Sequence, residues 1–250
     1  MIRAIAGKEL RSLFMSPLAW VILGVVQLIL GYFFLLQVDQ YLMLQPRLAG
    51  MQSAPGVTDV VVAPLFGNAS VILLLVVPII TMRLISEERR SGTLGLLTSA
   101  PVSPTQIVLG KYLGIVAFLG IMLAITALMP LSLLAGGWLD FGKLAGGLLG
   151  IGLLVAAFAA AGLFMSSLTS QPTIAAVSSF GLLLLLWVID WAARSQGATG
   201  GVLSYLSLLG HYESLIKGLF KSKDVIYYLL FIGMFLAFTV RRLEAERLTG

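Results

Sequence analysis

Residues 65–101 have the sequence LFGNASVILLLVVPIITMRLISEERRSGTLGLLTSAP. The first part, to about Arg83, is an apolar run long enough to cross a bilayer as a helix. The second part, Ile85–Pro101, is the densest charge cluster in the chain and precedes another apolar run of similar length. A charged connection between two such runs indicates a membrane protein with a turn that something outside the membrane can contact.

The composition of the whole chain supports the same fold class. Of 250 residues, 59% are hydrophobic and 11% are charged, and the mean hydropathy is +1.02, whereas soluble proteins are about 25% charged. Backbone groups in lipid must be paired within helices or a closed barrel. Because the apolar runs are about twenty residues long and do not alternate with a period of two, we expect an all-α integral membrane protein.

About six membrane-spanning helices are predicted, within one transmembrane domain of residues 1–250. Ser103, Pro104 and Gln106 supply the capping chemistry for the start of the third span. Pro78 should kink the second span and Pro130 should interrupt the third. The predicted spans lie near residues 18–37, 65–83, 106–135, 145–168, 173–191 and 225–240.

Other segments predict packing and connections. Residues 2–15 form an amphipathic helix whose polar face carries Lys8 and Arg11, followed by a turn at Pro17. We expect this helix to lie in the membrane interface, and the alternative is a simple extension of the first span. Glycines spaced by four from 142 to 150 predict close helix packing in lipid. Polar connections are expected from Asp39 to Pro64 and over residues 192–224.

The distribution of basic residues predicts that both termini are cytoplasmic, because basic residues collect on the inner side of membranes. With the N-terminus inside, ten of the 16 lysines and arginines fall on that side and six fall outside. The ten are Arg3, Lys8, Arg11, Arg83, Arg89, Arg90, Lys111, Arg241, Arg242 and Arg247. This bias explains the net charge of +5, so we expect no nucleic-acid binding.

Several kinds of chemistry are not expected of this chain. It has no Gly-x4-Gly-Lys-Ser/Thr phosphate loop, and we predict that it is not itself an ATPase. It has no cysteine and a single histidine, His211, so no catalytic, cofactor-binding or metal-binding residue is assigned. No span interior shows a clear ionisable residue, which argues against an ion-coupled carrier. A chain of this kind is expected to be driven from outside the membrane.

The charged segment itself predicts a docking element. We expect Glu87–Arg90 to extend the second span beyond the lipid and Gly92 to break that helix. Thr93 can then cap a short helix over residues 94–99, which ends before Pro101. Its leucines, at positions 94, 96 and 97, would be buried in a groove on a partner protein, with the flanking charges fixing the register. The alternative is a solvated connection.

This segment resembles the coupling-helix region of ABC-2 type transporter permeases, through EERRSGTL at 87–94 and LLTSAPVS at 96–103. The opening KELR at 8–11, followed by Ser16-Pro17, is similar to the opening of that family. The stretch HYES at 211–214, with Gly218, Asp224 and Tyr227 after it, resembles the gliding-motility-associated permease subfamily. One departure is Gly95, where members often carry Glu.

The resemblance implies a transmembrane subunit of the bacterial inner membrane that dimerises and pairs with two cytoplasmic ATPase subunits. ATP and Mg²⁺ would be bound by the ATPase and not by this chain. Residues 200–220 would form re-entrant helices on the outer side, and an auxiliary or extracytoplasmic partner is possible. The residues expected to contact the ATPase are Lys8, Arg11, Glu87, Glu88, Arg89, Arg90, Gly92, Thr93, Leu94, Leu96 and Leu97.

Three functions follow from these observations. The first is export or extraction of a substrate, which the sequence does not identify, driven by the ATPase. The second is a mechanical or regulatory membrane module driven by the same kind of ATPase, with the connection of residues 38–64 as its handle. The third is a channel or carrier that acts alone.

Overall fold

The computed structural model describes residues 1–48, 55–93, 102–135, 139–195 and 207–249, and the statements below concern these residues. Every regular element among them is helical, which confirms the all-α prediction. The elements are α1 (Ile2–Met15), α2 (Pro17–Leu48), the π-helix η1 (Thr58–Val62), α3 (Ala63–Thr81), α4 (Ser86–Arg90), α6 (Pro104–Ser132), the 3₁₀-helix η2 (Leu133–Ala135), α7 (Phe141–Leu168), α8 (Pro172–Ser195), α10 (Leu208–Ile216) and α11 (Ser222–Thr249).

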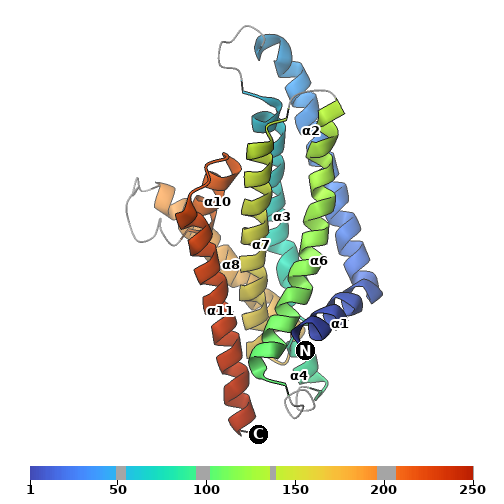
Figure 1. The fold of residues 1–250 in the computed structure, drawn as a ribbon, viewed down its shortest axis with the longest axis vertical. Helices are drawn as coiled ribbons and strands as arrows, with labels where there is room; N and C mark the ends of the chain where they lie inside the picture. Colours follow the sequence, from blue (N-terminus) through green and yellow to red (C-terminus); the bar gives the residue numbers. More distant parts are fainter. Residues whose placement is uncertain (49–54, 94–101, 136–138, 196–206, 250) are drawn as a thin grey trace.

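Six helical stretches of the described chain are long and apolar enough to cross a membrane. The two chain ends lie at the same end of the bundle, the lower end in Figure 1, together with α1 and α4. The prediction of about six spans is therefore confirmed by length and composition. The stretches are Pro17–Arg47, Thr58–Arg90, Pro104–Ala135, Phe141–Leu168, Pro172–Ile189 and Ser222–Arg247.

The helices are longer than the predicted spans, and two predicted connections are partly helical. The connection expected to begin at Asp39 lies in α2 as far as Leu48, and Thr58–Val62 forms the π-helix η1. Hydropathy locates the lipid-facing part of a helix, but a helix can continue beyond the lipid as long as its backbone remains paired. The expected interruption at Pro130 is also wrong, since α6 continues through it to Ser132.

Local capping chemistry was predicted well. The Ser103 hydroxyl accepts a hydrogen bond from the Gln106 backbone N–H, and the Gln106 side chain accepts one from the Ser103 N–H, at 3.3 and 3.4 Å. This capping box satisfies two backbone donors at the start of α6. At the start of α7, the Asp140 carboxylate accepts from the N–H groups of Gly142 and Lys143.

Helix α7 is the centre of the bundle, and it contacts α3, α6, α8, α10 and α11 (Figure 1). Its small residues permit these approaches, but the closest contacts to another membrane-spanning helix are at Gly147 and Gly162, which are not among the glycines spaced by four. A Cβ added at Gly147 would lie 2.6 Å from the Phe66 ring, and one at Gly162 would overlap the Thr81 hydroxyl. Gly146 and Gly150 pack against α10 and the residue that follows its C-cap, and not against another membrane-spanning helix.

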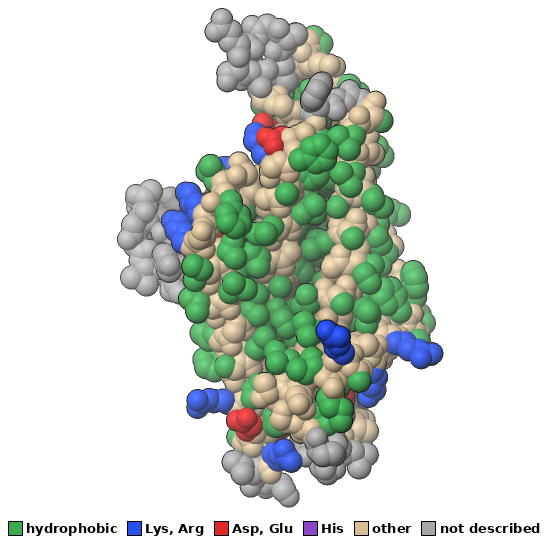
Figure 2. Space-filling model, viewed as in Figure 1, with side chains coloured by type: hydrophobic (Ala, Val, Ile, Leu, Met, Phe, Trp, Pro, Cys, Tyr) green, Lys and Arg blue, Asp and Glu red, His purple; other side chains and the backbone are tan. Residues whose placement is uncertain are grey.

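The surface is apolar along most of the bundle length. Figure 2 shows hydrophobic side chains over the middle of the face in view and charged side chains mainly toward its ends, most of all at the lower end. Large hydrophobic residues are exposed on α2, α8 and α11, including Val25, Leu28, Leu35, Val177, Leu185, Leu229, Leu230 and Phe238. These helices present the lateral surface that lipid or a partner would cover.

We expect Gly162→Ala to destabilise the protein by about 1–3 kcal/mol, because the added methyl group overlaps Thr81 in a packed helix contact. Gly152→Ala on the same helix is the matched control, since nothing lies within 4 Å of its added Cβ. Thermal unfolding of the two purified variants in detergent measures the difference. Equal melting temperatures would show that the α3–α7 contact is not tight.

Candidate functional site at the charged end of the bundle

The charged segment begins with a break in the second span. Helix α3 ends at Thr81, and after a turn at Met82–Ile85 the short helix α4 begins at Ser86. Glu87–Arg90 therefore do not continue the span as one helix, which corrects the prediction. The break is satisfied by Ser166 of α7, whose hydroxyl accepts from the N–H groups of Ile85 and Ser86, both at 3.1 Å, and donates to the Met82 carbonyl at 2.9 Å.

This bridging explains why the chain can turn at a buried position. A helix start has backbone N–H groups without partners inside the helix, and a buried group of this kind needs another acceptor. The N-cap residue of α4, Ile85, has no side-chain acceptor. The hydroxyl of Ser166 on α7, about 80 residues later in the sequence, is the acceptor instead.

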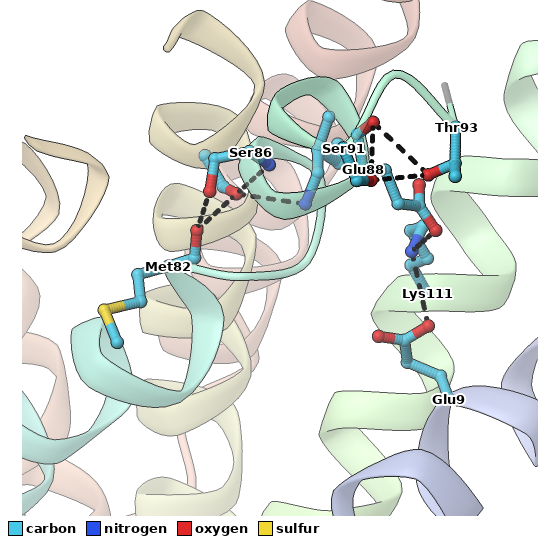
Figure 3. Close-up of polar contacts among 9 residues, drawn as sticks. Glu9, Met82, Ser86, Glu88, Ser91, Thr93 and Lys111 are labelled. Atoms are coloured by element: carbon cyan, nitrogen blue, oxygen red, sulfur yellow. Dashed lines mark hydrogen bonds and ion pairs between the residues drawn. The ribbon is translucent and has the colours of Figure 1, made fainter. Parts of the chain in front are cut away.

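Lys111 of α6 connects three helices. Its side chain is only 3% exposed, and its Nζ lies 2.7 Å from Glu88 Oε1 of α4 and 3.3 Å from Glu9 Oε2 of α1 (Figure 3). A buried ammonium group is stable only with opposite charges beside it. Lys111 lies about 10 Å along the helix axis from the start of α6.

Arg89 connects α4 to the two other helices at this end. Its guanidinium donates to the Ser167 carbonyl of α7 at 2.6 Å and forms an ion pair with Glu246 of α11. Arg242, one turn earlier on α11, also lies 3.4 Å from Glu246. Helix α4 is thus joined by side chains to α6, α7 and α11, and through Lys111 of α6 to α1.

Helix α1 packs against α6 through two glycines. A Cβ added at Gly110 would lie 2.6 Å from Ile5 Cβ, and one at Gly114 would lie 2.7 Å from Glu9 Cβ. The helix ends at Met15, and its C-cap residue Ser16 has extended backbone angles, so α1 is not a simple extension of the first span. The Gly-x3-Gly spacing at 110 and 114 is a packing signal that the sequence interpretation missed.

The residues predicted to contact an ATPase fall into three groups. Glu88 and Arg89 are half-buried in the ion pairs just described. Gly92 adopts φ +70°, which confirms the helix break there. The residues at 94, 96 and 97 lie outside the described residues, as does the rest of the predicted short helix. The exposed group comprises Lys8, Arg11, Glu87, Arg90, Gly92 and Thr93.

A second polar cluster lies between α10 and α11. The His211 Nδ1 atom lies 2.6 Å from Asp224 Oδ1, and both side chains are buried. The Tyr212 hydroxyl donates to the Phe66 carbonyl of α3 at 2.8 Å. The expected connection of residues 192–224 thus contains a packed helix, Leu208–Ile216. The His211–Asp224 and Tyr212–Phe66 contacts hold this helix against α11 and α3. Sequence reasoning placed His211 in the connection of residues 192–224 and did not pair it with Asp224.

We expect Lys111→Met to lower the free energy of unfolding by about 3 kcal/mol, because it leaves the Glu88 carboxylate without its closest cation. The double variant Lys111→Met/Glu88→Gln should lower the free energy of unfolding by less than the sum of the two single effects. Unfolding in detergent measures both effects. The matched control is Lys217→Met, which removes an exposed lysine 4.0 Å from Glu213 and should change stability by about 0.5 kcal/mol or less. Additive single effects would contradict the pairing.

Ser166→Ala should lower the free energy of unfolding by about 1–3 kcal/mol, since two buried N–H groups lose their shared acceptor. Ser178→Ala is the control, because that hydroxyl only bonds back to carbonyls of its own helix. A comparison of melting temperatures tests the difference. If the two variants melt together, the bridge across the α3–α4 break contributes nothing measurable.

Comparison with known proteins identifies the family. The family model described as ABC-2 family transporter protein matches residues 3–246. A search of curated proteins found no match. The match covers nearly the whole chain, and together with six apolar helices it describes a multi-pass membrane protein whose family members are membrane subunits and not themselves ATPases. The chain belongs to the ABC-2 transporter family.

Proposed function

We propose that this chain is the permease subunit that couples ATP hydrolysis by a separate cytoplasmic ATPase to export or extraction of a substrate. Family membership implies association with an ATPase subunit. The observation that carries the proposal is the set of contacts of α4, since ion pairs and a hydrogen bond join this short charged helix directly to α6, α7 and α11, and through Lys111 to α1.

The ion pairs and hydrogen bonds of α4 provide a way to transmit force to the neighbouring helices. A push on the exposed side of α4 reaches α6 and α1 through Lys111, and reaches α7 and α11 through Arg89. The Ser166 bridge keeps the α3–α4 turn in one conformation. A stiff contact of this kind moves helices together, because packed helices shift as units and not by continuous deformation.

In the same proposal, Glu87, Arg90 and Thr93 face the ATPase together with Lys8 and Arg11 of α1. The segment after Thr93, with its leucines at 94, 96 and 97, serves as the coupling element. ATP and Mg²⁺ are held by the ATPase. The end that carries both termini faces the cytoplasm of a bacterium, and two copies of the chain form the membrane part.

Three finer points belong to the proposal as well. Helix α1 lies at the inner membrane interface, and α10 is part of a re-entrant segment. The gliding-motility-associated subfamily remains the closest resemblance, and it rests on residues 211–227. An auxiliary membrane or extracytoplasmic partner completes the assembly.

A mechanical module is the second candidate function, and the length of α2 favours it. Its 32 residues span about 48 Å, whereas a bilayer core is about 30 Å thick. The projecting end exposes Leu42 and Met43, at 57% and 70%. If this end holds an extracytoplasmic partner, Leu42→Ser/Met43→Ser should abolish partner capture and leave ATPase association unchanged.

The ATPase contact can be tested by reversing exposed charges. Glu87→Arg/Arg90→Glu should weaken co-purification with the ATPase at least about tenfold, because like charges across an interface cost several kcal/mol. Stimulation of ATP hydrolysis by the permease should fall in parallel. The matched control is Lys221→Glu/Lys223→Glu, which changes exposed residues before and within the first turn of α11. Unchanged co-purification and ATP turnover in the first variant would contradict the proposal.

A further inference from the structure

A pocket opens between α1, the start of α2 and the α3–α4 turn. Its volume is about 200 Å³, below the range of about 300–1,000 Å³ that encloses a whole drug-sized ligand, so it has room for a lipid head group but not for a whole lipid. One side of the lining is apolar and consists of Leu13, Leu18, Ala19, Ile22, Ile79, Ile80 and Leu84. The other side is polar and consists of Glu9, Ser12, Ser16, Arg83 and Glu87. A pocket with two such sides fits an amphiphile and not a uniformly polar solute.

The position of the pocket along the bundle matches the edge of a membrane. Its apolar wall comes from the first turns of α2 and the last turn of α3, so it lies where two spans meet the charged end. Trp20 beside it is 57% exposed, and its Nε1–H donates to the Phe14 carbonyl at 2.8 Å. An exposed tryptophan with its polar edge satisfied near a helix end is typical of the membrane interface.

The charges of the pocket select a head group. Arg83 is an exposed cation able to contact a phosphate, and Glu87 is an exposed carboxylate four residues further along the chain, in α4. Glu9 adds a second carboxylate, whose Oε2 is shared with Lys111 (Figure 3). A head group that carries a phosphate beside an ammonium group could pair with both the arginine and the carboxylates. A head group that carries only negative charge would meet Arg83 but be repelled by the two carboxylates.

We infer that this pocket binds the amine-bearing head group of one phospholipid, drawn from the leaflet at the charged end. The lipid phosphate contacts Arg83, its ammonium group contacts Glu87 and Glu9, and the start of an acyl chain lies along Ile22, Ile79 and Ile80. The orientation of the protein in the membrane comes from the proposed function, but the site itself depends only on the pocket. The bound head group fills the space between the α1–α2 turn and α4.

Native mass spectrometry of the purified full chain tests this site, with phosphatidylethanolamine and phosphatidylglycerol as probes. We expect phosphatidylethanolamine to bind about threefold to fivefold more tightly, the scale of an exposed ion pair. Glu87→Gln should remove that preference, and Arg83→Gln should weaken binding of both lipids. The matched controls are Glu244→Gln and Arg241→Gln, which remove exposed charges on α11 and should bind both lipids as the wild type does.

Two outcomes would overturn the inference. One is equal binding of the two lipids, with Arg83→Gln indistinguishable from Arg241→Gln. The other is displacement of the lipid by free phosphoethanolamine at equal concentration, which would show a site for a soluble head group. The measurement uses the chain without an ATPase, so its failure leaves the proposed coupling untouched, and a failed co-purification test leaves the lipid site untouched.

Discussion

A lysine ammonium group cannot be buried inside an apolar helix bundle unless carboxylates come to it, and this constraint organises the charged end of the protein. Lys111 lies on α6, and the two carboxylates that approach it come from α1 and α4. Helix α1 must therefore cross α6 closely, which Gly110 and Gly114 allow. Helix α4 must turn back toward α6, which the Ser166 bridge allows.

The same residues explain how an apolar bundle can be mechanically continuous. Lipid supplies no hydrophobic force that holds helices together, so small residues and hydrogen bonds provide the contacts. In the described chain, α7 supplies both kinds, through Gly147 and Gly162 along its length and through Ser166 and the Ser167 carbonyl at its end. The central helix is thus tied most firmly where the charged turn lies.

Much of the fold could be predicted from the sequence, because membrane length and hydropathy limit a chain to few architectures. The six spans, the Ser103 cap and the break at Gly92 all follow from local rules. The ion pairs do not, since Lys111 and Glu88 are separated by a segment whose path no local pattern determines. The pairing of His211 with Asp224 was missed for a different reason, because the helices expected over residues 200–220 were predicted without any side-chain partner for the histidine.

The separation of the paired residues along the chain has a consequence for biosynthesis. Lys111 meets Glu9 across 102 positions, and Arg89 meets Glu246 across 157. Helix α1 therefore has no docking surface until the third span has been made, and α4 lacks one of its anchors until the last turns of α11 have left the ribosome. The charged end is completed only after α11 has been made, so a partner that binds this surface distinguishes a subunit with α11 in place from one that still lacks it.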